Sequence, residues 1–188
     1  MSKIAIVYHS GTGHTARMAE AVAEGVRSVE GVEVTLLRIE GTHIVEGRFH
    51  GDDLLAACDA ADGIIFGSPT YMGMVSGQFK SFADATGGRW YGQSWRDKVG
   101  AGFTVSNSLN GDKVVTIHYL FTLAMQHGMI WAGLPGLSQP DGVNRLGCNS
   151  GAMGQAGQEP PDVAPNAADL STGRALGQRV AEAVKRWK

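Results

Sequence analysis

The chain has little of several features that mark particular classes of protein. Its only two cysteines, Cys58 and Cys148, lie far apart and form no Cys-x-x-Cys pair, so neither a disulfide framework nor a thiolate metal site is indicated. No apolar run approaches the roughly 18 residues of a membrane-spanning helix, and no basic, then apolar, then small-residue leader precedes Ile4. We therefore expect a protein of the reducing cytoplasm with no membrane span.

An excess of charge of one sign is also lacking. The 16 Lys and Arg residues against 18 Asp and Glu residues leave a net charge of -2. Proteins that bind nucleic acid or membrane surfaces usually carry a marked basic excess, so neither partner is indicated. The 188 residues, 43% hydrophobic and 18% charged, are instead typical of a single globular domain spanning residues 1–188.

The most informative segment is a short loop of small and hydroxyl residues. Ser10–Thr15 (Ser-Gly-Thr-Gly-His-Thr) follows the apolar run Ile4–Tyr8 and precedes a helical pattern that starts at Ala16. The first backbone N–H groups of a helix lack partners inside it and carry about half a positive charge, so they attract anions. Glycines permit close approach of the backbone, and hydroxyls can donate to phosphate oxygens. The residues expected to bind the anion are Ser10, Gly11, Thr12, Gly13, His14 and Thr15.

Two other phosphate-binding loops fit this segment less well. A Walker A loop ends in Gly-Lys-Ser/Thr, and no lysine lies here. A dinucleotide fingerprint reads Gly-x-Gly-x-x-Gly, whereas Ala16 stands at its third glycine position. A single monophosphate fits better, and the alternative left open is a Ser/Thr-rich turn that only caps the helix.

Apolar runs alternate along the chain with segments of helical periodicity. Such alternation predicts an α/β fold, a doubly wound five-stranded parallel sheet with helices on both faces. The expected strands are Ile4–Tyr8, Val32–Leu37, Ile64–Phe66, Val99–Val105 and Met129–Trp131, and the expected helices are those from Ala16 to near Gly31, Asp52–Ala60, Ser76–Ala85, Lys113–Gln126 and Ala168–Trp187.

The Gly- and Pro-rich stretch over 133–165 is too long for an ordinary connection between a strand and a helix. We expect it to be a long loop excursion, either on the surface or ordered by contact with another subunit.

Two further loops of small and polar residues follow predicted strands. In doubly wound sheets, ligands bind at the carboxyl ends of the strands, so these loops should meet the Ser10–Thr15 loop and build one pocket. Pro69 is expected to fix a turn. The aromatic ring of Tyr71 and the thioether of Met72 could form a wall for a flat heterocycle, and the side chains of Asn107 and Asn110 could form hydrogen bonds with its edge. A monophosphate joined to a flat ring describes FMN; the alternative is that each loop is a routine connection. The residues concerned are Pro69, Thr70, Tyr71, Met72 and Gly73 in one loop, and Ser106, Asn107, Ser108, Leu109, Asn110 and Gly111 in the other.

Several motifs along the chain resemble those of a known family. It is similar to the WrbA-type NAD(P)H:quinone oxidoreductases of the NADPH-dependent FMN reductase family, from Lys3 to about Trp131 and weakly in the final helix. The resemblance implies the flavodoxin-like fold, with its strands in the order 2-1-3-4-5. The motifs that carry it are Val7–Ser10 with Gly13-His14, Met18–Gly25, Phe66–Thr70, Ser76–Gln78, Phe82–Gly88 with Trp90, and His127–Met129.

The resemblance also implies roles for single residues. Ser10–Thr15 would hold the FMN phosphate, with Thr12 near the nicotinamide cofactor, and the other two loops would line the ring. His127 would sit beside the ring, and Trp90 would contact the substrate. A lone histidine between a helix and a strand is otherwise more often a capping or core residue. Tyr71 departs from the family, which usually has a basic residue there.

The expected function is transfer of two electrons from NADPH or NADH to a quinone through bound FMN, in a homotetramer implied by the resemblance. The histidines show no metal-ligand spacing, so we expect no metal. Two alternatives remain open: a flavodoxin-type electron carrier and an FMN reductase that releases reduced flavin.

Overall fold

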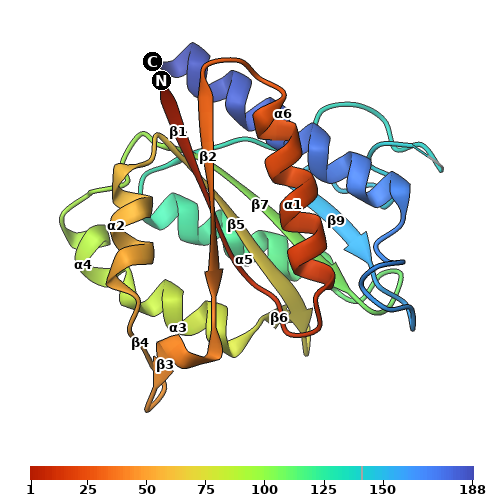
Figure 1. Ribbon diagram of the computed structural model, residues 1–188, viewed down its shortest axis with the longest axis horizontal. Helices are drawn as coiled ribbons and strands as arrows, with labels where there is room; N and C mark the ends of the chain where they lie inside the picture. The colour runs from red at the N-terminus through yellow and green to blue at the C-terminus, as the bar shows by residue number, and fades with distance from the viewer. Residues whose placement is uncertain (141) are drawn as a thin grey trace.

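A computed structural model describes residues 1–140 and 142–188 of the chain, and it has a central sheet with helices on both sides (Figure 1). The neighbouring parallel strands run in the order β2-β1-β5-β7-β8, which confirms the predicted order 2-1-3-4-5. Their bounds are β1 Ser2–His9, β2 Val32–Ile39, β5 Gly63–Tyr71, β7 Val99–Ser106 and β8 Ile130–Trp131.

The fifth position of the sheet is shared by two short strands. β8 pairs with the start of β7 at Val99 and Gly100, and β9 (Ala152–Gln155) pairs with its end, from Phe103 to Ser106. The stretch 133–165, which we expected to be a long loop excursion, therefore contains one strand, β9, that returns to the sheet. A strand of four residues with a central glycine carries no periodic pattern by which the sequence could reveal it.

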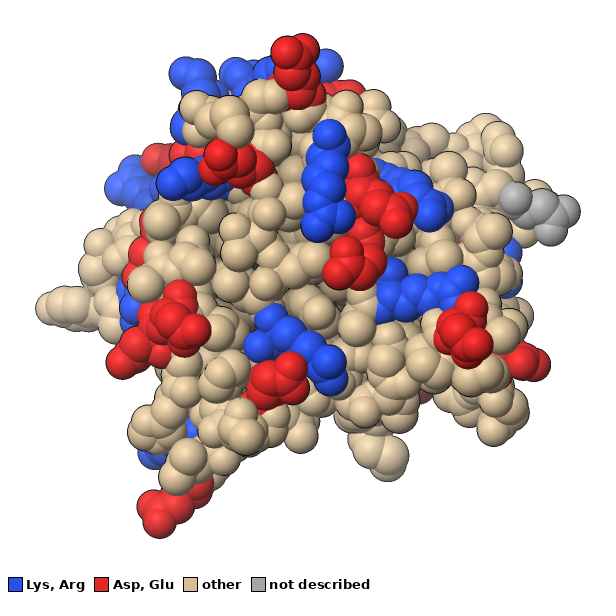
Figure 2. Space-filling model, viewed as in Figure 1, with Lys and Arg blue, Asp and Glu red and all other residues tan. Residues whose placement is uncertain are grey.

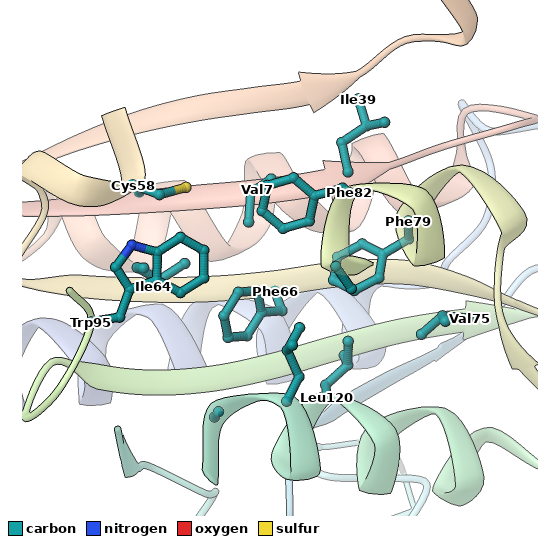
Figure 3. Packing of buried hydrophobic residues seen from close by; sticks show 14 of the residues in the cluster. Val7, Ile39, Cys58, Ile64, Phe66, Val75, Phe79, Phe82, Trp95 and Leu120 are labelled. Atoms are coloured by element: carbon teal, nitrogen blue, oxygen red, sulfur yellow. The ribbon is translucent and has the colours of Figure 1, made fainter. Parts of the chain in front are cut away.

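Both faces of the sheet are covered by helices. The helices are α1 His14–Arg27, α2 Asp52–Ala60, α3 Gly77–Ala85, α4 Gly87–Tyr91, α5 Lys113–Gln126 and α6 Ala167–Trp187. Along β1, Ala5 and Val7 belong to one buried cluster and Ile4 and Ile6 to the other, because successive side chains point to opposite faces. Figure 3 shows the first cluster, in which Phe66 packs among the rings of Phe79 and Trp95. Burial on both sides explains why the central strands read as continuous apolar runs.

On the other face, α1 and α6 lie side by side and pack backbone to backbone (Figure 1). A Cβ added at Gly25 would lie 2.0 Å from the carbonyl oxygen of Arg174, and one at Gly177 would lie 1.9 Å from that of Val22. Real Cβ atoms do not approach so closely, so the two glycines set the distance between the helices.

The helix bounds agree closely with the prediction for α2 and α5. α1 starts earlier than expected, at His14, because Gly13 adopts φ 96° and turns the chain into the helix. Several small elements besides β9 were not predicted, among them α4 and the antiparallel pair β3 (Ile44–Val45) and β4 (Arg48–Phe49), which follows a 3-10 turn at Gly41–His43.

One predicted turn is wrong. Pro69 lies inside β5, opposite Val105 of β7, and the strand continues to Tyr71. The chain reverses only at Met72 and Gly73, both with positive φ, and returns as β6 (Met74–Val75). Proline can occupy this position because it needs no N–H there, close to the end of the strand.

Candidate functional site

A cavity of about 350 Å³ opens at the carboxyl ends of β1, β5, β7 and β9, at the lower edge of the sheet in Figure 1. This is the edge where ligands bind in doubly wound sheets, and the volume lies within the roughly 300–1,000 Å³ of small-molecule sites. The cavity is lined by Thr12, His14, Thr15, Pro69, Thr70, Tyr71, Val105, Ser106, Asn107, Ala156, Gly157, Gln158 and Glu159. The three predicted loops therefore meet, although only some residues of each reach the cavity.

The Ser10–Thr15 loop is held in shape by its own first residue. The Ser10 hydroxyl oxygen accepts from the backbone N–H groups of Gly13 and Ala16, both at 3.1 Å. Within the described residues, no acceptor meets the backbone N–H groups of Thr12, His14 and Thr15. Ser10 thus shapes the loop rather than lining the cavity, and the start of α1 keeps free donors for an anion.

His14 joins this loop to a segment that the sequence did not single out. Its Nε2 lies 2.8 Å from the Glu159 carbonyl oxygen, and its Nδ1 lies 2.9 Å from the Thr12 hydroxyl. A carbonyl only accepts, so Nε2 carries the hydrogen and, in the neutral imidazole, Nδ1 accepts from Thr12. Thr15, by contrast, has a hydroxyl that makes no bond to the described residues and lies in the cavity wall.

Besides the three predicted loops, a fourth segment lines the cavity: residues 156–159, in the stretch that follows β9. The Arg17 guanidinium donates to the Pro161 carbonyl at 2.7 Å, and a Cβ at Gly13 would lie 2.9 Å from two carbons of the Pro161 ring. The backbone N–H groups of Ala156 and Gly157 donate to the carbonyls of Ser106 and Asn107. The segment reaches the cavity because β9 returns the chain to the sheet, and no local pattern in the sequence predicts this.

Tyr71, at the end of β5, covers the Ser10–Thr15 loop. A Cβ at Gly11 would lie 2.4 Å from the Tyr71 hydroxyl, so the Tyr71 ring packs closely over Gly11 and a larger residue there would displace it. The Thr70 hydroxyl points away, to the hydroxyls of Thr104 and Thr116, each at 2.8 Å. Met72 is fully exposed at the hairpin turn, and neither it nor Gly73 lines the cavity, which corrects the expectation for both.

The third loop contributes only its first residues to the cavity. Ser106 and Asn107 line it, whereas Leu109 and Asn110 line a separate hollow beside Arg145. Neither Ser108 nor Gly111 lines the cavity, and the expectation that the whole loop does so is wrong. The loop turns away because Gly111 and its successor both adopt left-handed conformations.

A buried lysine that the sequence analysis missed lies at the centre of this turn. Lys113 is 1% exposed, and its Nζ donates to the Ser106 hydroxyl, the Ser108 carbonyl and the Leu109 carbonyl at 2.8, 2.9 and 2.8 Å. Burial lowers the pKa of Lys113 to about 8. Lys113 begins a helix directly after the polar residues Asn110 and Asp112, where lysine is normally exposed, so no local pattern predicts its burial.

His127 and Trp90 lie at the opposite edge of the sheet. His127 follows α5 and precedes β8, and its ring packs against that of Trp95, with centroids 4.4 Å apart and the ring planes tilted by 34°. Its Nε2 lies 2.9 Å from the Thr86 hydroxyl, the residue just before α4, which carries Trp90. Neither residue lines the cavity of its own chain, and the burial of His127 against Trp95 and Thr86 agrees with the alternative, a capping or core residue.

Burial lowers the pKa of His127 to about 4 from an ordinary value near 6.5. The His127 imidazole therefore binds a proton more readily in the unfolded chain than in the folded one, and the stability of the fold decreases as the pH falls from 6.5 towards 4. We expect about 3 kcal/mol of acid destabilisation from this residue. Acid unfolding followed by circular dichroism should show a weaker pH dependence in His127→Gln than in the exposed control His118→Gln. Equal acid profiles would contradict the assignment.

The donor set suits a phosphate carried by a flat ring. Free N–H groups at the start of α1 and the Thr15 hydroxyl provide donors to an anion, and Tyr71 provides an aromatic wall next to them. No group of three or more possible metal-ligating side chains occurs among the described residues, and none of their helices is long and apolar enough to cross a membrane.

Such a fold and cavity define a flavodoxin-like protein with a mononucleotide site. The family model described as NADPH-dependent FMN reductase matches residues 2–137, and the chain belongs to this family. A curated relative named Flavodoxin FldP, from Pseudomonas aeruginosa, is 43% identical and covers 96% of each chain. One named NAD(P)H dehydrogenase (quinone), from Syntrophobacter fumaroxidans, is 37% identical and covers 98% of each. The crystal structure of the flavodoxin, WrbA-like protein from Agrobacterium tumefaciens has a TM-score of 0.78 at 44% identity and covers all of both chains.

Proposed function

We propose that the protein is an FMN-dependent oxidoreductase that carries two electrons from NADPH or NADH to a quinone. The observation that carries the proposal is the cavity at the start of α1, where free backbone donors lie beside the aromatic wall of Tyr71. The family and the relative named NAD(P)H dehydrogenase (quinone) support it. FMN supplies the chemistry when bound, because its ring can accept a hydride and return two electrons.

The chain's own part is binding, orientation and exclusion of water. The N–H groups of Thr12, His14 and Thr15 would hold the phosphate, in the favourable field of the helix start. Tyr71 and the wall at Ser106 and Asn107 would flank the ring, and the 156–161 segment would close the cavity from the far side. None of these side chains acts as a covalent nucleophile.

Steady-state kinetics test this proposal directly. The donor and the quinone would use one cavity in turn. Double-reciprocal plots of the rate of NAD(P)H oxidation against benzoquinone concentration, one for each of several fixed NAD(P)H concentrations, should therefore give parallel lines. Intersecting lines would count against a shared site, and absence of quinone-dependent NAD(P)H oxidation by yellow protein would contradict the enzymatic function.

A second candidate is a flavodoxin-type electron carrier, which the relative named Flavodoxin FldP favours. A carrier that docks basic partners needs an acidic face. Figure 2 shows Lys and Arg interspersed with Asp and Glu on the face in view, and the net charge is only -2. A carrier would fail to oxidise NAD(P)H without a separate reductase. The third candidate, an FMN reductase that releases reduced flavin, would lose FMN during gel filtration.

The assembly we propose is a homotetramer in the cytoplasm. Trp90 is 47% exposed and lies at the edge opposite the cavity, so it could contact substrate only in the cavity of a second copy. Cys58 and Cys148 are buried and form no disulfide with each other, which is compatible with a reducing compartment. Light scattering after size exclusion should give four times the monomer mass; a monomeric active enzyme would exclude a role for Trp90.

A further inference from the structure

Lys113 carries a buried charge with no counter-ion next to it. Its three N–H groups are all used, on one hydroxyl and two backbone carbonyls, which are neutral acceptors. Among the described residues, no carboxylate lies within ion-pair distance of its Nζ. Asp169, which acts on it from further away, is already engaged by the Arg145 guanidinium at 2.9 Å.

A buried charge without a counter-ion destabilises the folded protein. Buried charges are usually paired, and an apolar side chain of similar length would fill the space without the cost of desolvation. The hydrogen bonds of Lys113 offset only part of that cost, since they are made to neutral groups. A positive field is therefore maintained at this point of the molecule.

The Lys113 ammonium lies directly behind the cavity wall. The Ser106 oxygen that accepts from Lys113 belongs to a residue of the cavity wall, so the ammonium is in direct contact with that wall. The Ser106 hydrogen is donated to the Ser108 carbonyl at 3.0 Å, which fixes the orientation of the hydroxyl. The loop is also wound tightly, since a Cβ at Gly111 would lie 2.3 Å from the same oxygen. The ammonium is thus held in place before any ligand binds.

We propose that Lys113 is a positioning residue that shapes the 106–109 wall around its ammonium and raises the reduction potential of the flavin by holding a positive charge behind that wall. The proposal rests on the proposed binding of FMN in this cavity. Two-electron reduction adds negative charge to the ring system, so a fixed positive charge nearby stabilises the reduced form more than the oxidised form. A low-dielectric surrounding strengthens the effect.

The test compares Lys113→Gln with the wild type by the dissociation constant of oxidised FMN and by the midpoint potential against a reference dye. Gln retains two donors for the loop carbonyls but removes the charge. We expect the affinity for reduced FMN to fall at least tenfold more than that for oxidised FMN, which lowers the two-electron potential by about 30 mV or more. Lys80→Gln is the matched control, because Lys80 is exposed and pairs with Asp84 on α3.

An unchanged potential in folded Lys113→Gln would overturn the proposal, whether or not both affinities fall together, because a purely structural role lowers them equally. If Lys113→Gln fails to fold, Lys113→Met removes the charge without a buried polar group, and the same shift is expected. The dye method needs no NAD(P)H. A wild type that binds FMN but does not oxidise NAD(P)H therefore refutes the proposed enzyme and leaves the Lys113 test intact, whereas a wild type without FMN affinity refutes both.

Discussion

Gly13→Val is expected to weaken FMN binding about a hundredfold while changing riboflavin binding little. Gly13 has φ 96°, a conformation that β-branched residues avoid, and a Cβ there would press on the Pro161 ring at 2.9 Å. Relief requires movement of the loop that presents the free donors. Loss of two charge-assisted hydrogen bonds, at about 1.5 kcal/mol each, corresponds to about a hundredfold in affinity. Fluorescence quenching of each flavin measures the effect.

The control is Gly31→Val, between α1 and β2. Gly31 also has a positive φ, of 80°, but nothing lies within 4 Å of its added Cβ. The two variants therefore share backbone strain and differ in the contact with Pro161 and the distance from the cavity. Equal losses of FMN affinity in both would show that general destabilisation, and not the loop at the start of α1, is responsible.

Gly177→Ala should have the largest effect on stability, a loss of about 3 kcal/mol or more. The added methyl would lie 1.9 Å from the Val22 carbonyl oxygen and 3.0 Å from the Val26 amide nitrogen, and backbone atoms cannot turn aside as a side chain can. The helices α1 and α6 must separate, which places the cost at the upper end for overpacking. For a chain of this length the melting temperature should fall by roughly 10 °C.

Gly88→Ala in α4 is the matched control for this second prediction. Nothing lies within 4 Å of an added Cβ at Gly88, and alanine favours helix over glycine by up to about 1 kcal/mol. Gly88→Ala should therefore leave the melting temperature unchanged or raise it. A Gly177→Ala variant that melts with the wild type would mean that α1 and α6 do not pack as closely as described.

The fold was predictable where each element carries its own pattern. The apolar runs at β1 and β5 are buried on both faces, and the helix predicted over Lys113–Gln126 has the same bounds as α5. The split between β8 and β9 was not predictable, because strands of two and four residues are too short for a period and are specified by pairing with β7. Tertiary contacts, not local propensity, decide such elements.

The site was predictable as far as sheet topology determines it. The rule that ligands bind at carboxyl ends correctly brought Thr12, Tyr71 and Ser106 to one cavity. It failed for residues whose orientation depends on a turn: Met72 leaves at a hairpin, and Leu109 turns away around a lysine. His127 was placed by its similarity to a motif, but its position after α5 puts it at the amino edge.

The central claim is that the start of α1 holds a phosphate. The most direct measurement is the affinity of the apoprotein for FMN against riboflavin, which has the same ring without the phosphate. We expect FMN to bind at least about a hundredfold more tightly, the equivalent of two charge-assisted hydrogen bonds. Equal affinities would contradict the claim, because the donors of Thr12, His14 and Thr15 would then contribute nothing to binding.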